Sequence, residues 1–181
     1  DVSKKLNLDQ QELSFLIEEK LNETSKKQTN DLKGGPTWVT VGNDVSCDYR
    51  TGTTKIQQAI NDGHTEIRIA HGTYAENILI DDINVSLLGG YADCAAADNN
   101  DYNTTSTSTI IQPASGSGTP AIRVTGNSTR NNITLRNLSI RNGENGGSYV
   151  GGGVSFYQAD TNVSMQNMSI NQNNGNWGGG V

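Results

Sequence analysis

The chain has 181 residues, of which 33% are hydrophobic and 6% aromatic, and its formal net charge at pH 7 is -6. So few apolar residues with 21 glycines favour many short strands joined by tight turns around a narrow core. The acidic balance argues against nucleic acid as a partner, because binding to phosphates needs a basic face. No run of about 18 apolar residues occurs, so we expect no membrane span.

Residues 1–35 are expected to form a leader before the main domain of residues 36–181. Four apolar residues in the leader recur at helical spacing: Leu13, Leu16, Ile17 and Leu21. This spacing predicts a helix over residues 10–22, followed by a polar linker. The helix could serve in docking or oligomerisation, or it could pack on its own domain.

A short helix is predicted after the first strand-like segment, which begins at Thr37. Thr53 or Thr54 is its expected N-cap, and Gly63 is its expected stop. Its apolar face would consist of Ile56, Ala59 and Ile60. Because so short a helix is unstable alone, we expect it to cover the open end of a stack of strands, where a repeat protein needs a cap.

Three runs in which apolar and polar residues alternate follow this helix. They are Ile67 with Ile69, Ile78 with Ile80, and Val85 with Leu87. Such alternation predicts strands with one buried face. With turns at Gly72 and at Asp81–Asp82, we interpret the three strands as one full coil of a three-faced solenoid. A polar loop is expected after Cys94.

A repeat about 30 residues long organises the second half of the chain. Residues 131–143 read NNITLRNLSIRNG and residues 162–173 read NVSMQNMSINQN, with Asn137 matching Asn167. In both copies this Asn breaks the alternation, which indicates a corner between two short strands. The motif GGGV at residues 151–154 recurs at the end of the chain, so we expect an N-terminal fragment of a longer protein that stops early in a coil.

These segments resemble the N-terminal part of the right-handed parallel β-helix, or pectin-lyase-like, superfamily. The runs TTKIQQAINDG, TEIRIAHGTYAENILI and VSLLGGY are similar to its start, and NITLRNLSI and NVSMQNMSI are similar to a rung whose corner Asn stacks between coils. The resemblance implies an all-β solenoid, a right-handed parallel β-helix of about three coils with a capping helix. It also implies a structural asparagine ladder at Asn137 and Asn167.

The GGGV motif resembles repeats of secreted and surface β-helix proteins of bacteria, such as polymorphic outer-membrane proteins and autotransporter passengers. The Phe-x-x-Asn half of that pattern is not met after Phe156. This resemblance implies a protein secreted from, or displayed on, a bacterial cell.

The two cysteines, Cys47 and Cys94, could be buried thiols or a disulfide. Each lies just outside a run of predicted strands at the edge of the same unit, and neither has a His at metal-ligand spacing. We therefore favour a disulfide, which would place the protein in an oxidising compartment.

No catalytic residues are predicted. A lyase site would need an acidic cluster beside a base such as Arg123, and none repeats on that strand face. A glycosidase would need two carboxylates about 5–10 Å apart, whereas Asp81 and Asp82 are adjacent in a turn and should face apart.

Two weaker binding patterns remain. Asp98, Asn100 and Asp101 offer hard oxygen ligands at a spacing that calcium could use, although a plain Asx-rich loop is favoured and no cofactor is expected. Tyr157 and Trp177 could stack on sugar rings, although single surface aromatics are common.

The sequence predicts a secreted or cell-surface β-helix protein that acts as an adhesin-like or passenger-like binding or stalk module. The alternative is the N-terminal part of a polysaccharide-active enzyme, a lyase or glycosidase, with its active site in further coils. A third hypothesis is a scaffold in a filament or matrix. Expected partners are carbohydrate or a cell-surface molecule, and a second copy bound through the leader helix or the uncapped last coil.

Overall fold

A computed structural model describes residues 37–103, 108–126, 130–145, 151–157, 159–176 and 178–181. The predicted leader, residues 1–35, lies outside them and stays a prediction. The described part consists mainly of strands, with two short helices, and the paired strands run parallel to one another. Neither of these helices has the length and apolar character that crossing a membrane requires.

The largest sheet has five strands in the order β1-β2-β5-β8-β12. Its strands are β1 (Trp38–Val41), β2 (Glu66–Ala70), β5 (Val85–Tyr91), β8 (Asn131–Arg136) and β12 (Thr161–Gln166). A second sheet contains β3 (Gly72–Tyr74), β6 (Thr109–Ile111), β9 (Ser139–Ile140) and β13 (Ser169–Ile170). A third contains β4 (Ile78–Asp81), β7 (Ile122–Thr125) and β11 (Val154–Phe156), and a two-stranded sheet contains β10 (Glu144–Asn145) and β14 (Asn174–Gly175).

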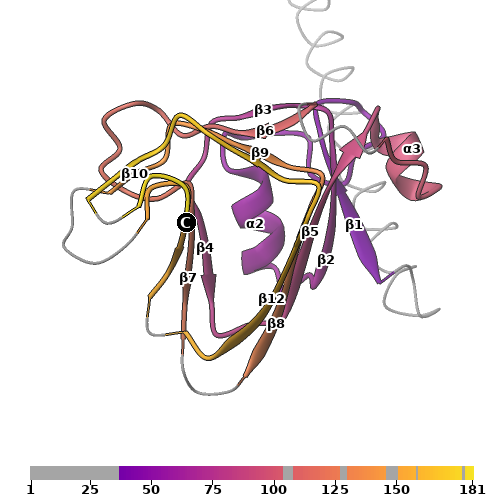
Figure 1. The fold of residues 1–181 in the computed structure, drawn as a ribbon. Coiled ribbons are helices and arrows are strands. Elements are labelled where there is room, and N and C mark those ends of the chain that lie inside the picture. Colours follow the sequence, from indigo (N-terminus) through magenta and orange to yellow (C-terminus); the bar gives the residue numbers. More distant parts are fainter. Residues whose placement is uncertain (1–36, 104–107, 127–129, 146–150, 158, 177) are drawn as a thin grey trace, which may run out of the picture. The chain divides into compact units, whose positions relative to one another are not determined.

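The chain visits the first three sheets in turn, so that each pass lies beside the previous one (Figure 1). Ile67, Leu87 and Leu135 occupy one register position on three successive passes, and all three are fully buried. The apolar residues of each alternating strand therefore point into a core enclosed by the sheets.

The register corrects one detail of the sequence interpretation. Val85–Tyr91 pairs with Glu66–Ala70, so Val85 begins the next pass and does not complete the first coil. Gly72–Tyr74, where the sequence predicts a turn, is a short strand that pairs with β6. Three residues are too short for alternation to be recognised.

The corners between strands are formed by residues with left-handed backbone conformation. Asn137 and Asn167 have φ of 54° and 50°, and Asn142 and Gln172 at the next corner have φ of 53° and 55°. Positive φ is uncommon outside glycine, and Asn is tolerated best because its short side chain can hydrogen-bond locally. The same corner geometry thus recurs 30 residues apart at two places in the pass.

Helix α2 (Lys55–Asn61) packs against β1, β2 and β4 (Figure 1) and confirms the predicted short helix. Its buried residues are Ile56, Ala59 and Ile60, as predicted. The N-cap position is Thr54, but its side chain makes no capping hydrogen bond. The carboxylate of Glu76 replaces it, accepting hydrogen bonds from the N–H groups of Ile56 and Gln57 at 3.2 and 3.0 Å.

Helix α3 (Cys94–Asp98) begins where the sequence predicts a polar loop. Its N-cap is Asp93, whose Oδ1 accepts a hydrogen bond from the N–H of Ala96 at 2.7 Å. Arg68 ties the helix to the five-stranded sheet: its Nη1 donates to the carbonyl oxygen of Ala97 at 2.7 Å, and its Nε lies 2.9 Å from Glu66 Oε1. The polar residues that follow α3 led to the prediction of a loop, because the local sequence does not show that tertiary contacts stabilise a short helix here.

Candidate functional site

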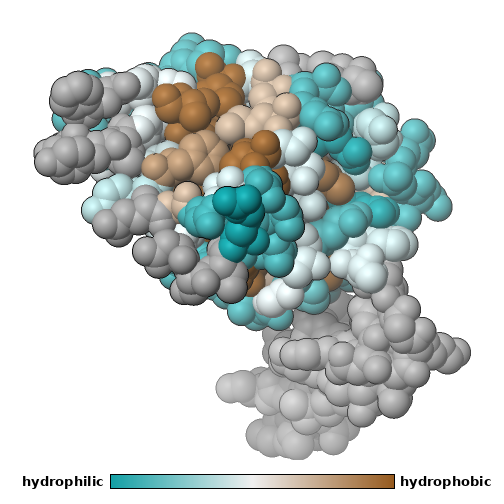
Figure 2. Space-filling view, turned by 60° about the horizontal axis from the view of Figure 1, so that its bottom comes forward, coloured by the Kyte–Doolittle hydropathy of each residue, from teal (hydrophilic) through white to brown (hydrophobic). Residues whose placement is uncertain are grey.

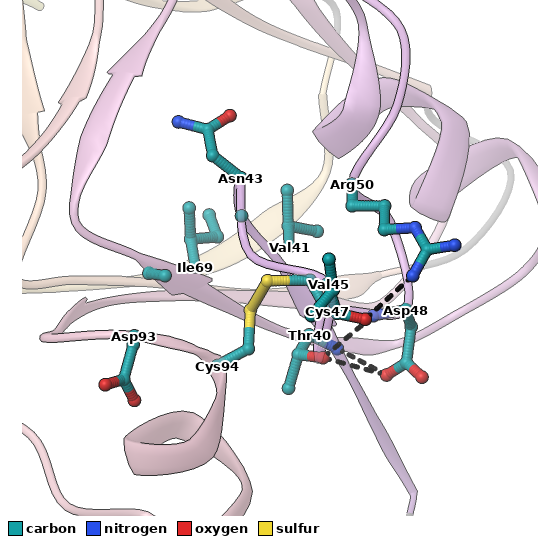
Figure 3. Close-up of a disulfide and its surroundings, with 12 residues drawn as sticks. Thr40, Val41, Asn43, Val45, Cys47, Asp48, Arg50, Ile69, Asp93 and Cys94 are labelled. Atoms are coloured by element: carbon teal, nitrogen blue, oxygen red, sulfur yellow. Dashed lines mark hydrogen bonds between the residues drawn. A yellow bond between two sulfur atoms is a disulfide. The ribbon is translucent and has the colours of Figure 1, made fainter.

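The predicted disulfide is present (Figure 3). Cys47 and Cys94 are bonded with an S–S distance of 2.02 Å, and both are buried. The bond joins the segment after β1 to the first residue of α3. Gly42 passes so close that a Cβ on it would lie 2.5 Å from Cys47 Sγ, so the disulfide is packed directly against the backbone. Its role is to hold the first strand and α3 together.

Asn137 and Asn167 contact each other at a corner of the fold. Asn137 is fully buried, and its Nδ2 donates to the carbonyl oxygen of Gly89 at 3.3 Å. Its Oδ1 accepts a hydrogen bond from Nδ2 of Asn167 at 3.1 Å. The two side-chain amides hydrogen-bond to each other, and Asn137 also hydrogen-bonds to the backbone at the corner. Their role is therefore structural, and they are not available to a ligand.

The three oxygen-bearing residues considered for calcium lie around the end of α3. Asp98 is the last residue of α3, and Asn100 Oδ1 accepts a hydrogen bond from the hydroxyl of Tyr91 at 3.0 Å. Within the described part of the chain, no group of three or more His, Cys, Asp or Glu residues is arranged to hold a metal ion. The expectation of a plain Asx-rich loop in preference to a calcium site stays an untested prediction.

An open hollow of about 450 Å³ lies beside α3. It is lined by Ala92, Ala96, Asp101, Tyr102 and Asn103. The guanidinium of Arg136 lies 4.3 Å from the centre of the Tyr102 ring. This arginine of β8 therefore covers Tyr102, one of the residues that line the hollow. Burial raises the pKa of the neighbouring Tyr91 hydroxyl, and the charges of Arg136 and Arg68 oppose that rise.

A second group of residues gathers on the outer face of β4, β7 and β11, here called the outer face of the third sheet. Leu79, Arg123 and Ser155 occupy one register position across the three strands. Leu79 is 45% exposed and Arg123 is exposed. Tyr157 follows β11 directly, and the Arg123 guanidinium lies 5.4 Å from the centre of its ring.

The side-chain hydroxyl of Ser155 is the most unusual group on this face. Its side chain points to the outer face by register, yet it is 1% exposed, and its hydroxyl has no hydrogen-bond partner among the described residues. Buried polar groups are normally paired, and this hydroxyl is an exception among the described residues. The accessible groups of this face, an arginine with five donors and a phenol ring, suit a polar ligand that offers acceptors and an apolar ring face.

Asp81 and Asp82, the acids at the edge of this face, have different hydrogen-bond partners. Asp81 Oδ1 accepts a hydrogen bond from Thr125 Oγ1 at 2.6 Å. Asp82 Oδ1 accepts one from Nδ2 of Asn131, at the start of β8, at 2.9 Å. The two carboxylates thus engage different strands.

The structure brings Tyr157 together with Arg123, whereas Trp177 lies outside the described residues. The sequence pattern suggested Arg123 only as a lyase base and gave no prediction for Leu79 or Ser155. Aligning the segments ILID (residues 78–81), IRVT (122–125) and VSFY (154–157) by their alternating apolar residues would have placed Leu79, Arg123 and Ser155 on one face. Nothing in the sequence signals that Ser155 is covered.

Comparison of the chain with protein-family models, with curated proteins and with solved structures found no match. Functional interpretation therefore depends on the geometry described above.

Proposed function

We propose that this chain is a secreted or cell-surface protein of the right-handed parallel β-helix class, and that it acts as an adhesin-like or passenger-like module that binds carbohydrate. The solenoid assignment is supported by the parallel passes, which pair residues 30 positions apart over β8 and β12. The left-handed corners at Asn137 and Asn167 add to this support, because repeated corners let identical passes stack.

The buried disulfide supports the extracellular part of the proposal. Structural disulfides persist in oxidising environments, and the Cys47–Cys94 bond closes a sequence separation of 47 residues within the fold.

The single observation that carries the binding role is the pairing of the exposed Arg123 guanidinium with the half-buried ring of Tyr157 beside β7 and β11. A sugar presents an apolar ring face to an aromatic side chain and hydroxyl or carboxylate oxygens to an arginine. Leu79 extends the apolar surface along the same register position.

Calorimetric titration of the full chain with neutral and uronic oligosaccharides tests this role. Tyr157→Ala and Arg123→Ala should each weaken binding about tenfold. Arg130→Ala, which removes an exposed arginine paired with Asp160, should leave the affinity unchanged. Equal binding by the wild-type protein and both site variants would contradict the proposed face. Release of unsaturated sugar products would instead favour the polysaccharide-lyase alternative.

A further inference from the structure

The connection between β5 and β6 is an addition that the repeating passes do not need. Residues 92–108 make this connection, whereas residues 137–138 alone join β8 to β9 and residues 167–168 alone join β12 to β13. Because β5, β8 and β12 belong to one sheet and β6, β9 and β13 to another, all three connections turn the same corner of the fold. Long connections that a scaffold does not require are where proteins often place binding groups.

The described part of this connection is fixed to the sheet. Helix α3 packs against β1, β2 and β5 (Figure 1), and the disulfide holds its first residue (Figure 3). After the helix, the N–H of Asp101 donates to the carbonyl oxygen of Ala96, and the N–H of Asn103 donates to that of Gly90, both at 2.8 Å. A Cβ on Gly90 would lie 2.4 Å from the carbonyl oxygen of Asn103, so the two backbones are in close contact. Residues 101–103 are therefore tied both to α3 and to β5.

The aromatic ring of Tyr102 is held in place by two neighbours. The guanidinium of Arg136 lies 4.3 Å from the ring centre, and the ring of Tyr91 meets it edge-on with centroids 6.1 Å apart. Nε of Arg136 is buried and has no hydrogen-bond partner among the described residues, so the arginine holds the ring while one of its own hydrogen bonds is unmade. Tyr102 is still 39% exposed, which leaves ring surface open to a ligand. A ring that is already fixed loses little freedom when a ligand stacks on it.

The hollow beside α3 combines this ring with groups of different character. Its other lining residues are Ala92, Ala96, Asp101 and Asn103. Apolar side chains gather on one face of the molecule (Figure 2), whereas the lining of the hollow is mixed. Asp101 is exposed, so its carboxylate can accept hydrogen bonds from a ligand that lies on the Tyr102 ring.

The charges around the hollow favour a neutral ligand. The carboxylate of Asp101 would repel an anion, and the guanidinium of Arg136 against the Tyr102 ring would oppose a cation stacked on the same ring. A neutral sugar meets neither repulsion. Its apolar ring face can stack on an aromatic side chain, and its hydroxyl groups can donate hydrogen bonds to a carboxylate.

We propose that the hollow beside α3 is a second carbohydrate-binding site, which takes a neutral sugar unit stacked on Tyr102 and hydrogen-bonded to Asp101. Its volume of about 450 Å³ lies within the range of small-molecule sites. The site shares no residue with the outer face of the third sheet, where the exposed Arg123 suits an anionic group. It is therefore independent of the function proposed above.

NMR of the full chain, labelled with ¹³C at its alanine methyl groups, tests the proposal, because Ala92 and Ala96 report from within the hollow. The probes are the methyl glycosides of glucose, galactose and mannose at up to about 50 mM, since a single sugar unit binds weakly. At least one of them should shift the two signals, which Ala92→Ser and Ala96→Ser assign. The signals of the buried Ala59 and Ala121 should stay in place.

Variants then separate the two contacts from the fold. Tyr102→Ala removes the stacking surface and Asp101→Ala removes the acceptor, and each should weaken binding at least about tenfold. Tyr102→Phe keeps the ring and should keep the affinity. The matched control is Asp98→Ala, since Asp98 is an exposed acid at the end of α3 that does not line the hollow.

Three results would overturn the proposal. The first is that none of the three glycosides moves the Ala92 and Ala96 signals. The second is that Asp98→Ala weakens binding as much as Tyr102→Ala does. The third is tighter binding of glucosamine or glucuronate than of the neutral glycosides, which would show that charge governs recognition. Arg123→Ala should leave the Ala92 and Ala96 titrations unchanged, so failure of this site and failure of the Arg123 face can be told apart.

Discussion

Nδ2 of Asn167 donates a hydrogen bond to Oδ1 of Asn137 across 3.1 Å, and both residues hold their backbones in the left-handed region. One residue type thus meets two requirements of the corner. The backbone must turn sharply, and the polar groups that the turn buries must be paired. An amide that both donates and accepts can repeat this solution on the next pass.

Replacing Asn137 should therefore be costly. Asn137→Ala keeps a Cβ in the left-handed region, removes the bond to Gly89 and leaves Asn167 without its acceptor. We expect a loss of about 3 kcal/mol in the free energy of unfolding, measured by urea denaturation. Asn137→Gly relieves the backbone cost, so its loss should be smaller by about 1 kcal/mol. Equal losses in the two variants would show that the left-handed backbone contributes nothing.

Removal of the disulfide should also destabilise the fold. The double variant Cys47→Ala with Cys94→Ala opens a loop closed over 47 residues, and the chain-entropy estimate gives a loss of about 4 kcal/mol. Denaturant unfolding with and without a reducing agent measures it. The reducing agent should destabilise the wild-type protein and leave the double variant unchanged; an effect on both would mean that the agent acts elsewhere.

Glu76 should make stability depend on pH. Burial raises the pKa of Glu76, although the N–H groups of Gln57 and Ile56 and the charge of Lys55 oppose the shift. The folded state then holds this proton more tightly than the unfolded chain, so the favourable contribution of Glu76 is fully present below the unfolded value of 4.5 and is lost as pH rises through the folded pKa. The unfolding free energy of the wild-type protein minus that of Glu76→Gln should fall as pH rises above the unfolded value of 4.5.

Glu144 supplies the opposite control for the same titration. The N–H groups of Gly116 and Gly118 lower the pKa of Glu144, so its contribution is present above the unfolded value of 4.5 and is lost as pH falls through the folded pKa. The difference between wild type and Glu144→Gln should therefore rise with pH. If both differences change in the same direction, the assignment of at least one carboxyl group is wrong.

Arg68 should matter far more than an exposed arginine. Arg68→Met leaves Glu66 and the carbonyl oxygen of Ala97 without the guanidinium that pairs them, at a site where the arginine side chain is 9% exposed. We expect a loss of about 3 kcal/mol in the free energy of unfolding. Arg130→Met breaks an exposed ion pair with Asp160 and should cost less than about 1 kcal/mol. Similar losses would contradict the anchoring role of Arg68.

Local sequence patterns predicted the structure correctly where the main role of a residue is to be buried on one face of a strand or helix. Alternation in ILID and NITLR predicts buried strand faces, and Ile78, Ile80 and Ile133 are buried. The helix at residues 55–61 was predictable because its apolar residues share one face. Glu76 as its cap was not, since the carboxylate comes from a loop about 20 residues away in sequence and its approach depends on the folded passes.

The candidate binding face was predictable only in part. Tyr157 was singled out for its aromatic ring, but its pairing with Arg123 depends on the register of β11 against β7, which alternation alone does not specify. The burial of Ser155 is a tertiary effect with no local signal. The short strand at residues 72–74 was missed because three residues carry too little pattern.

The disulfide divides the molecule into two mechanically different parts. Strands of the later passes pair only with the neighbouring passes, so a force applied to the last residues should first peel off the last pass, a step of about 30 residues that is roughly 100 Å long when extended. The segment between Cys47 and Cys94 includes α2, β2, β3, β4 and β5, and its ends are joined covalently. Pulling cannot lengthen that loop, so the early passes would remain as a short, inextensible anchor after the later ones have come apart.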